Sequence, residues 1–251
     1  DIVKGCIIER PKVIYNAKTK KFVMWFHLEL KGRGYDAARS GIAISDTPAG
    51  PYTYLRSIRP NAGHWPLNVT TKEKDPASIE RTKQENEAFS GGPSPKHAQF
   101  NILGSHFEGG QMARDMNLFV DDDGKSYHIY YPEHNSTFHI SLLAEDYLDP
   151  SGTYTRNFPF RWMEAPAVFK REGKYYLIAS GCTGWAPNAA RSAVAESIFG
   201  PWTELGNPCI GINPQNQLGP EKTFGGQSTC VFPVIGKKDA YIAMFDIWRP
   251  E

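Results

Sequence analysis

The sequence predicts an all-β fold arranged as a β-propeller, and three observations support this prediction. Of the 251 residues, 13% are aromatic, 23 are glycine and 19 are proline, a profile typical of turn-rich β proteins. Short β-branched and aromatic runs alternate with turn residues, whereas helical spacing of apolar residues is almost absent. One plan of two strands joined by a turn recurs four times, and propeller blades are four-stranded antiparallel sheets. A β-sandwich is the competing architecture.

Each of the four repeated hairpins begins with a polar residue and continues into an apolar run. The chain then turns at Gly, Asp or Lys and returns in a second apolar run, which is the pattern of a β-hairpin. We expect these hairpins at residues 9–26, 115–131, 164–178 and 227–245.

Two of the hairpins are followed by a second repeated element. Small-residue runs at 40–44 and 191–195 precede the dipeptides Gly50-Pro51 and Gly200-Pro201. Each run predicts a third strand, and each Gly-Pro predicts a turn into a fourth strand. Four such units are few for a ring that must close, so we expect the propeller to be incomplete at both ends of this chain.

The segment between the first two hairpins differs in composition from the rest. Residues 58–110 are rich in Asn, Lys, Glu, Pro and Gly and show little periodicity. We expect a loop-rich insertion between blades here, with helical turns around residues 75–89. Residues 1–251 are otherwise expected to form a single propeller domain.

Charge and cysteine content exclude several classes of protein. The net charge of +1 argues against binding to nucleic acid or membrane surfaces through charge. No run of 18 apolar residues is present, so no membrane span is expected. The four cysteines lack the spacing of metal ligands, and buried free thiols are favoured over disulfides. No cluster of metal ligands is evident.

The first residue of each hairpin occupies an equivalent place, because the innermost strand of a blade begins at one rim of the channel. These residues are Glu9, Asp115, Glu164 and Gln227. Converging carboxylates raise one another's pKa and destabilise the fold, so three acids at one rim suggest a function. Hydrolysis of a glycosidic bond uses such a group, with one protonated acid and a second group that activates water.

At these positions the chain resembles glycoside hydrolase family 43, whose members are five-bladed β-propellers. The resemblance is strongest to the exo-β-1,3-galactanase-like branch and to galactan- and arabinan-active, Bacteroides-type enzymes. The segments that carry it are residues 9–13, 114–124, 164–167, 181–188, 226–229 and 246–250. The resemblance implies that this chain lacks part of the first blade and the C-terminal closure of the ring. It also implies a secreted or periplasmic monomer without a cofactor, and it allows a structural calcium ion.

The resemblance assigns a role to each rim residue. Glu164 is expected to be the general acid and Asp115 the group that tunes it. The resemblance places the family's usual base upstream of the first residue here. In the galactanase-like branch a glutamine at the position of Gln227 orients or activates the water instead. The expected substrate-binding residues are Glu9, Arg10, Tyr35, Thr183, Trp185 and Asn188.

The implied function is that of an inverting exo-glycosidase. Its substrate would be terminal galactose on the β-1,3-galactan-type side chains of plant polysaccharides. An α-L-arabinofuranosidase or β-xylosidase on the same scaffold is the alternative enzyme. A propeller that binds carbohydrate without catalysing a reaction is the alternative that is not an enzyme. It stays open because Gln227 occupies a position where an acid could act in catalysis.

Overall fold

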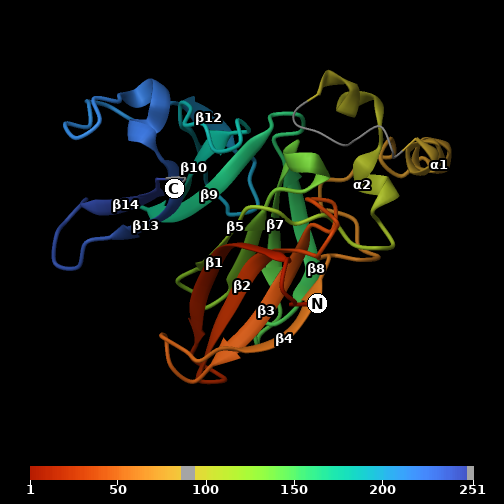
Figure 1. The fold of residues 1–251 in the computed structure, drawn as a ribbon, viewed down its shortest axis with the longest axis horizontal. Helices are drawn as coiled ribbons and strands as arrows, with labels where there is room; N and C mark the ends of the chain where they lie inside the picture. The colour runs from red at the N-terminus through yellow and green to blue at the C-terminus, as the bar shows by residue number, and fades with distance from the viewer. Residues whose placement is uncertain (86–93, 248–251) are drawn as a thin grey trace. The chain divides into compact units, whose positions relative to one another are not determined.

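The computed structural model describes residues 1–85 and 94–247. In this part of the chain the strands form three four-stranded antiparallel sheets and one two-stranded sheet (Figure 1). The contacts divide the chain into two compact units, residues 1–161 and residues 162–251, which we call the N-terminal and C-terminal units. The prediction of a mostly-β protein with blade-like, four-stranded sheets is confirmed.

The first sheet of the N-terminal unit contains the first predicted hairpin and the strands that follow it. Its order is β1 (Ile7–Asn16), β2 (Lys21–Glu29), β3 (Arg39–Ser45) and β4 (Thr53–Ile58). Asn16 closes the β1–β2 turn, because its side-chain oxygen accepts the backbone N–H groups of Lys18 and Thr19 at 3.0 and 2.9 Å. The sheet therefore begins with a turn whose polar closure is encoded locally.

The second sheet of this unit follows the same plan. Its order is β5 (Met116–Val120), β6 (Ser126–Tyr130), β7 (Phe138–Leu143) and β8 (Pro150–Asn157). Gly124 adopts φ 78° in the β5–β6 turn, and its N–H donates to the Asp121 carbonyl oxygen at 2.9 Å. This conformation is one that glycine adopts without the strain other residues would incur.

The two sheets of the N-terminal unit share one hydrophobic core. Trp25 and Ile42 from the first sheet are fully buried and belong to one cluster with Met116 and Tyr130 from the second. The Trp25 indole also donates to the Tyr147 carbonyl oxygen at 2.9 Å, so its polar edge is satisfied. This packing fixes β1 and β5 in one body, and both strands begin at predicted rim positions.

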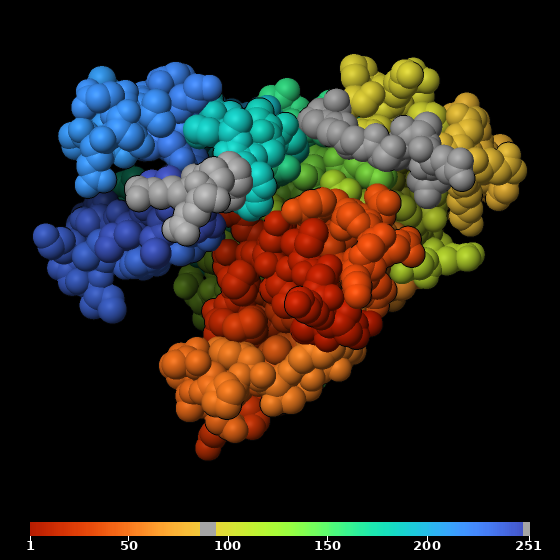
Figure 2. All heavy atoms as spheres, viewed as in Figure 1, coloured from red at the N-terminus to blue at the C-terminus, as the bar shows by residue number. Residues whose placement is uncertain are grey.

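The segment between β4 and β5 forms short helices. They are α1 (Pro76–Gln84), the 3-10 helix η2 (Pro95–Gln99) and α2 (Ile102–Ser105), and the described residues between 59 and 115 hold no strand. Asp75 caps α1 by accepting the Ser78 N–H at 2.9 Å. The predicted helical turns are confirmed at α1, while 86–89 lie outside the described residues. In Figure 2 the yellow atoms of this segment gather at one corner of the unit.

The C-terminal unit contains the third and fourth predicted hairpins. One sheet has the order β12 (Thr203–Gly206), β11 (Arg191–Ala195), β10 (Lys174–Gly181) and β9 (Met163–Arg171). The second pairs β13 (Gln227–Pro233) with β14 (Tyr241–Asp246), preceded by the 3-10 helix η4 (Pro220–Gly225). β13 lies against β9.

The repeat found in the sequence is therefore present in the backbone. All four predicted hairpins form, and both Gly-Pro dipeptides lie between a third and a fourth strand with cis peptide bonds. The four cysteines are free thiols, as expected, but they are half-buried rather than buried. No helix among the described residues is long and apolar enough to cross a membrane.

Candidate functional site

A β-bulge at the start of β1 sets the direction of Glu9. Glu9 pairs with His27 and Lys12 pairs with Trp25, so two residues of β1 face a single residue of β2. Arg10, inside the bulge, adopts φ 52°, a left-handed conformation that is uncommon outside glycine. A bulge bends its strand and redirects side chains, and here it interrupts the regular pairing between Glu9 and Lys12.

The same bulge occurs at the start of β9 in the C-terminal unit. Glu164 pairs with Ser180 and Ala167 pairs with Ile178, so again two residues face one. Ala165 adopts φ 55°, which matches the residue after Glu9. The sequence repeat of an acid, one residue and a proline thus corresponds to one backbone structure used twice.

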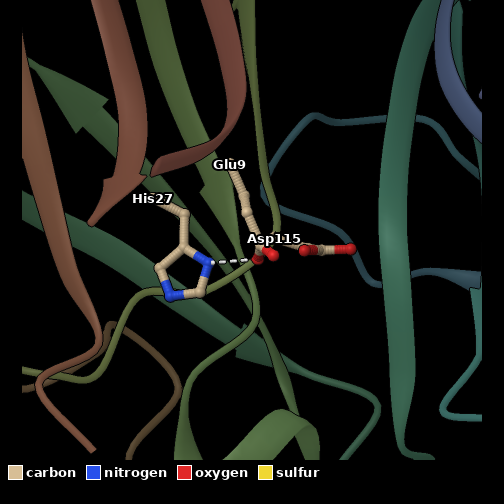
Figure 3. Close-up of side chains that lie close together, drawn as sticks. All are labelled: Glu9, His27 and Asp115. Carbon is tan, nitrogen blue, oxygen red and sulfur yellow. Dashed lines mark ion pairs between the residues drawn. The ribbon is translucent and has the colours of Figure 1, made fainter. Parts of the chain in front are cut away.

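Glu9 and Asp115 lie together in the N-terminal unit (Figure 3). The Tyr35 hydroxyl donates to Glu9 Oε1 at 2.8 Å, and His27 Nδ1 is 3.3 Å from Glu9 Oε2. Arg10 Nε lies 3.3 Å from Asp115 Oδ2, and both of these side chains are more than four-fifths buried. The structure therefore brings together Glu9, Arg10, Tyr35 and Asp115, four of the predicted site residues, and their roles stay predictions.

Behind this group lies a buried pair that the sequence analysis did not identify. His27 is 2% exposed, and its Nε2 is 2.7 Å from Glu29 Oε1. Glu29 is fully buried, and its second oxygen accepts the backbone N–H of Ala38 at 2.9 Å. Both imidazole nitrogens thus face a carboxylate, which is the arrangement of a protonated imidazolium with two acceptors.

The charges of this group follow from its contacts. Burial lowers the pKa of His27, but Glu29 and Glu9 outweigh burial and the pKa is raised. Burial likewise raises the pKa of Glu9, but contacts with His27 and Tyr35 outweigh it and the pKa is lowered. Burial and the neighbouring carboxylate raise the pKa of Tyr35, so its phenol remains a donor. These two shifts favour an ionised Glu9 beside a protonated His27.

Glu9, His27 and Asp115 also have the residue types of a metal site. One ligand atom from each lies within 4.8 Å of the others. A metal would require a neutral imidazole with a free lone pair, whereas the two glutamates around His27 favour the proton. Calcium, moreover, selects oxygen ligands over imidazole nitrogen. The donor set therefore fits a proton on His27 better than a cation among the three residues.

Gln227 and Glu164 meet at Ser180 in the C-terminal unit. The Gln227 amide donates from Nε2 to Ser180 Oγ at 3.1 Å, and Ser180 Oγ donates to the Glu164 carbonyl oxygen at 3.4 Å. Gln227 and Ser180 are 9% and 3% exposed. Ser228 strengthens the junction by donating its hydroxyl to the Ala165 carbonyl oxygen. The orientation of the Gln227 amide is thus fixed beside the strand that carries Glu164.

The predicted residues of the loop after β10 have different local roles. Asn188 accepts the Gly181 N–H at 2.8 Å and donates to Thr183 Oγ1 at 2.7 Å. Thr183 in turn donates to the Ala186 carbonyl oxygen at 2.6 Å, so these two side chains shape the loop itself. Trp185 is 50% exposed at its tip. Contact of these three residues with substrate stays a prediction.

The predicted site residues thus form two groups, one in each unit. The pair missed by sequence reasoning, His27 and Glu29, does leave a signal in the sequence. Both are polar residues in an otherwise apolar run, two positions apart, so they point to the same face of the strand.

Comparison with known proteins places this site in a family. The profile of the glycosyl hydrolases family 43 matches residues 90–218. A solved family 43 β-1,3-galactosidase, BT3683 with galactodeoxynojirimycin, is 51% identical over 100% of this chain and 70% of its own, with a TM-score of 0.86. The exo-β-1,3-galactanase 1,3Gal43A of Clostridium thermocellum is 36% identical over 97% of this chain and 42% of its own, with a TM-score of 0.70.

A curated relative is more distant. The β-D-galactofuranosidase xynD of Aspergillus niger is 30% identical over 112 residues, which are 41% of this chain and 32% of that protein. The chain thus spans about a third of this relative and less than half of the Clostridium enzyme. The family profile covers half of the chain and the match to the β-1,3-galactosidase covers all of it, so the chain belongs to glycoside hydrolase family 43.

Proposed function

We propose that the protein is an inverting exo-glycosidase that releases terminal galactose from β-1,3-galactan-type polysaccharide side chains. The observation that carries this proposal is the 51% identity, over the whole chain, to a structure described as a β-1,3-galactosidase. The presence of Glu9, Asp115, Glu164 and Gln227 at equivalent hairpin positions supports it. We further propose that the four-stranded sheets are blades of a five-bladed ring.

Glu164 acts as the general acid in this proposal. Its proton passes to the glycosidic oxygen as the bond to the anomeric carbon breaks, and Asp115 tunes its proton affinity. Water attacks the anomeric carbon from the opposite face, which inverts the configuration. Gln227 orients this water, and its imidic tautomer accepts the proton that the water loses. The hydrogen bond to Ser180 supports this role, because it holds the amide in one orientation.

Glu9, Arg10 and Tyr35 bind hydroxyl groups of the sugar in this proposal. The ionised Glu9 accepts hydrogen bonds, while the Arg10 guanidinium and the Tyr35 phenol donate them. The contacts Tyr35–Glu9 and Arg10–Asp115 support the assignment, because they hold each of the three side chains in place without substrate. A preorganised group of this kind reduces the entropy lost when the sugar binds.

The test is hydrolysis of nitrophenyl β-galactopyranoside and of β-1,3-galactobiose by the parent protein and by Glu164→Gln. Removing a general acid is expected to lower kcat for β-1,3-galactobiose about 10²- to 10⁴-fold. The loss for the nitrophenyl substrate should be smaller, because nitrophenolate leaves without needing a proton. Glu196→Gln is the matched control, because the substitution is the same, the Glu196 side chain is 80% exposed, and the contact that it weakens is an exposed ion pair with Lys174. NMR of the first product should show α-galactose, the inverted anomer.

Other outcomes would redirect the assignment. Full turnover of β-1,3-galactobiose by Glu164→Gln would remove that residue from the role of acid. Preference for nitrophenyl arabinofuranoside, xyloside or galactofuranoside would keep the scaffold but change the sugar, and the Aspergillus relative makes the galactofuranoside a necessary substrate in the panel. Binding of galactan without release of any sugar would identify a carbohydrate-binding propeller instead.

We also propose that the protein acts in the periplasm or outside the cell. The reason is physical, since a polysaccharide substrate does not cross a membrane and must be trimmed where it is encountered. Fractionation of the source cells, with detection by antibody, tests this, and recovery in the cytoplasmic fraction would contradict it.

A further inference from the structure

A cavity lies in the N-terminal unit, beside the helical segment between β4 and β5. Its volume is about 550 Å³. Its walls come from residues 72–81 around α1, residues 98–103 around α2, and the chain around Glu133, Arg156 and Phe160. Binding sites for small molecules occupy roughly 300–1,000 Å³, so the volume is that of a ligand site.

The cavity lies at the same end of the second sheet as Asp115. Asp115 directly precedes β5, and its carbonyl oxygen accepts the N–H of Tyr131, the residue after β6, at 3.3 Å. Glu133 follows in the 3-10 helix η3 (Glu133–Asn135), and Arg156 stands next to last in β8, which runs parallel to β6. β8 is three strands from β5, so the cavity lies about 14 Å across the sheet from Asp115.

The floor of the cavity is a preorganised ion pair. Glu133 is 1% exposed, and Arg156 donates to both of its oxygens at 2.7 Å. Arg156 also lies 3.5 Å from Glu73 and over the Phe160 ring at 5.8 Å. Residues 133–135 all adopt positive φ, between 52° and 63°. Such strained backbone persists where surrounding contacts hold it, and it clusters at ligand sites.

The lining selects the chemistry of the ligand. It has three cationic and three acidic side chains, namely Lys72, Arg81, Arg156, Glu73, Asp75 and Glu133. Their charges balance, so an anion gains no net attraction, and six charged groups exclude an apolar ligand. Donors and acceptors beside the faces of two phenylalanines suit a neutral molecule with many hydroxyl groups, which both donate and accept.

We propose that this cavity is a distal subsite that binds sugar units of the galactan beyond the galactose that is released. The proposal rests on the proposed function for its substrate. The rim shared with Asp115 and the estimated separation make it a site for longer substrates, with no contact to the terminal sugar. It also gives the segment between β4 and β5 a function, since α1 and its flanking residues form one wall.

The test compares substrates of increasing length. Lys72 and Arg81 are exposed, so the double variant Lys72→Ala/Arg81→Ala should keep the fold, and it also removes the hydrogen bond that Arg81 donates to the Gln99 carbonyl oxygen at 2.8 Å. Circular dichroism and urea unfolding of the variant check that the fold is kept. Lys74→Ala/Lys83→Ala is the matched control, since both lysines are exposed in the same segment but lie outside the cavity lining. We measure KM and kcat for nitrophenyl β-galactopyranoside, β-1,3-galactobiose and β-1,3-galactotetraose.

We expect KM for the tetraose to rise about threefold to tenfold for each hydrogen bond lost. KM for the nitrophenyl substrate should stay unchanged in both double variants. An equal KM for the tetraose in the cavity variant and the control would overturn the proposal. If the parent hydrolyses no galactoside, the proposed function is wrong, but the subsite proposal can still be tested. Calorimetric titration with the tetraose then shows whether the cavity binds the sugar. Binding weakened only in the cavity variant supports the subsite, and binding that is absent or unaffected overturns it.

Discussion

Replacing His27 by glutamine removes the positive charge between Glu9 and Glu29 while keeping a polar side chain of similar size. Glu29 is fully buried, and its charge is balanced in place by the His27 ring at 2.7 Å. The remaining contact, the Ala38 N–H, is neutral. The variant therefore leaves a buried carboxylate without its counter-charge, which is the costly half of a broken ion pair.

Removing one partner of a buried pair costs about 3–5 kcal/mol. Taking about 3 kcal/mol, because the Ala38 hydrogen bond survives, we expect Tm to fall by about 6–12 °C in a chain of this size. Changing Glu29 to glutamine as well removes the unpaired charge. The double variant His27→Gln/Glu29→Gln should therefore recover about 1–3 kcal/mol relative to His27→Gln alone.

The assay is urea unfolding of the parent, both single variants and the double variant, followed by KM measurements on nitrophenyl β-galactopyranoside. His64→Gln is the control, because it makes the same change outside the site. We expect KM to rise in His27→Gln, since Glu9 loses the contact that orients it. A loss of under 1 kcal/mol in His27→Gln, or a double variant no more stable than that single variant, would refute the reasoning.

Three further outcomes follow from the structure. Because the pKa of His27 is raised, its contribution to stability is complete below pH 6.5 and should be lost as pH rises through the pKa of His27 in the folded protein. Because the pKa of Glu9 is lowered, its contribution is complete above pH 4.5 and should be lost as pH falls through the pKa of Glu9 in the folded protein. Urea unfolding midpoints that do not change over either pH range would contradict this. Ser180→Ala releases the Gln227 amide, so kcat should fall about threefold to tenfold with KM unchanged, and an unaltered kcat would argue against an oriented Gln227. Gly41→Ala places a Cβ 2.2 Å from the Phe26 ring, so urea unfolding should show a loss of about 1–3 kcal/mol, and an unchanged midpoint would show that the ring moves freely.

The strands could be predicted from the sequence because their signals are local. Alternating apolar runs around turn residues identified the four repeated hairpins, and the Gly-Pro dipeptides identified the step into the fourth strands β4 and β12. Strands β7 and β8 were not placed, because no Gly-Pro dipeptide lies between them. The start of α1 was equally local, since Asp75 caps the helix and Pro76 fits its first turn. These elements depend on contacts within a few residues, which a single sequence displays.

The group around His27 could not be predicted in the same way. Its position beside Glu9 depends on the register between β1 and β2 and on the bulge that interrupts it. Its charge depends on Glu29, which is fully buried in the folded protein and accepts the backbone N–H of Ala38, nine residues further along the chain. The cavity at Glu133 has the same origin, because it joins side chains from α1 and β8 that are far apart in sequence. Tertiary contacts, rather than local preferences, create both features.

The bulge that β1 and β9 share sets the position of a carboxylate in each strand but does not set its chemical role. Arg10 and Ala165 have little in common as side chains, yet their φ angles differ by only a few degrees and each is followed by proline. The bulge thus places a carboxylate at the same point of each strand, and the neighbouring side chains determine the chemical role of that carboxylate. His27 and Tyr35 contact the carboxylate of Glu9, whereas Ser180 lies opposite Glu164 on the next strand and accepts a hydrogen bond from Gln227. A different reaction on this scaffold would therefore require different side chains around the carboxylate, with the strands unchanged.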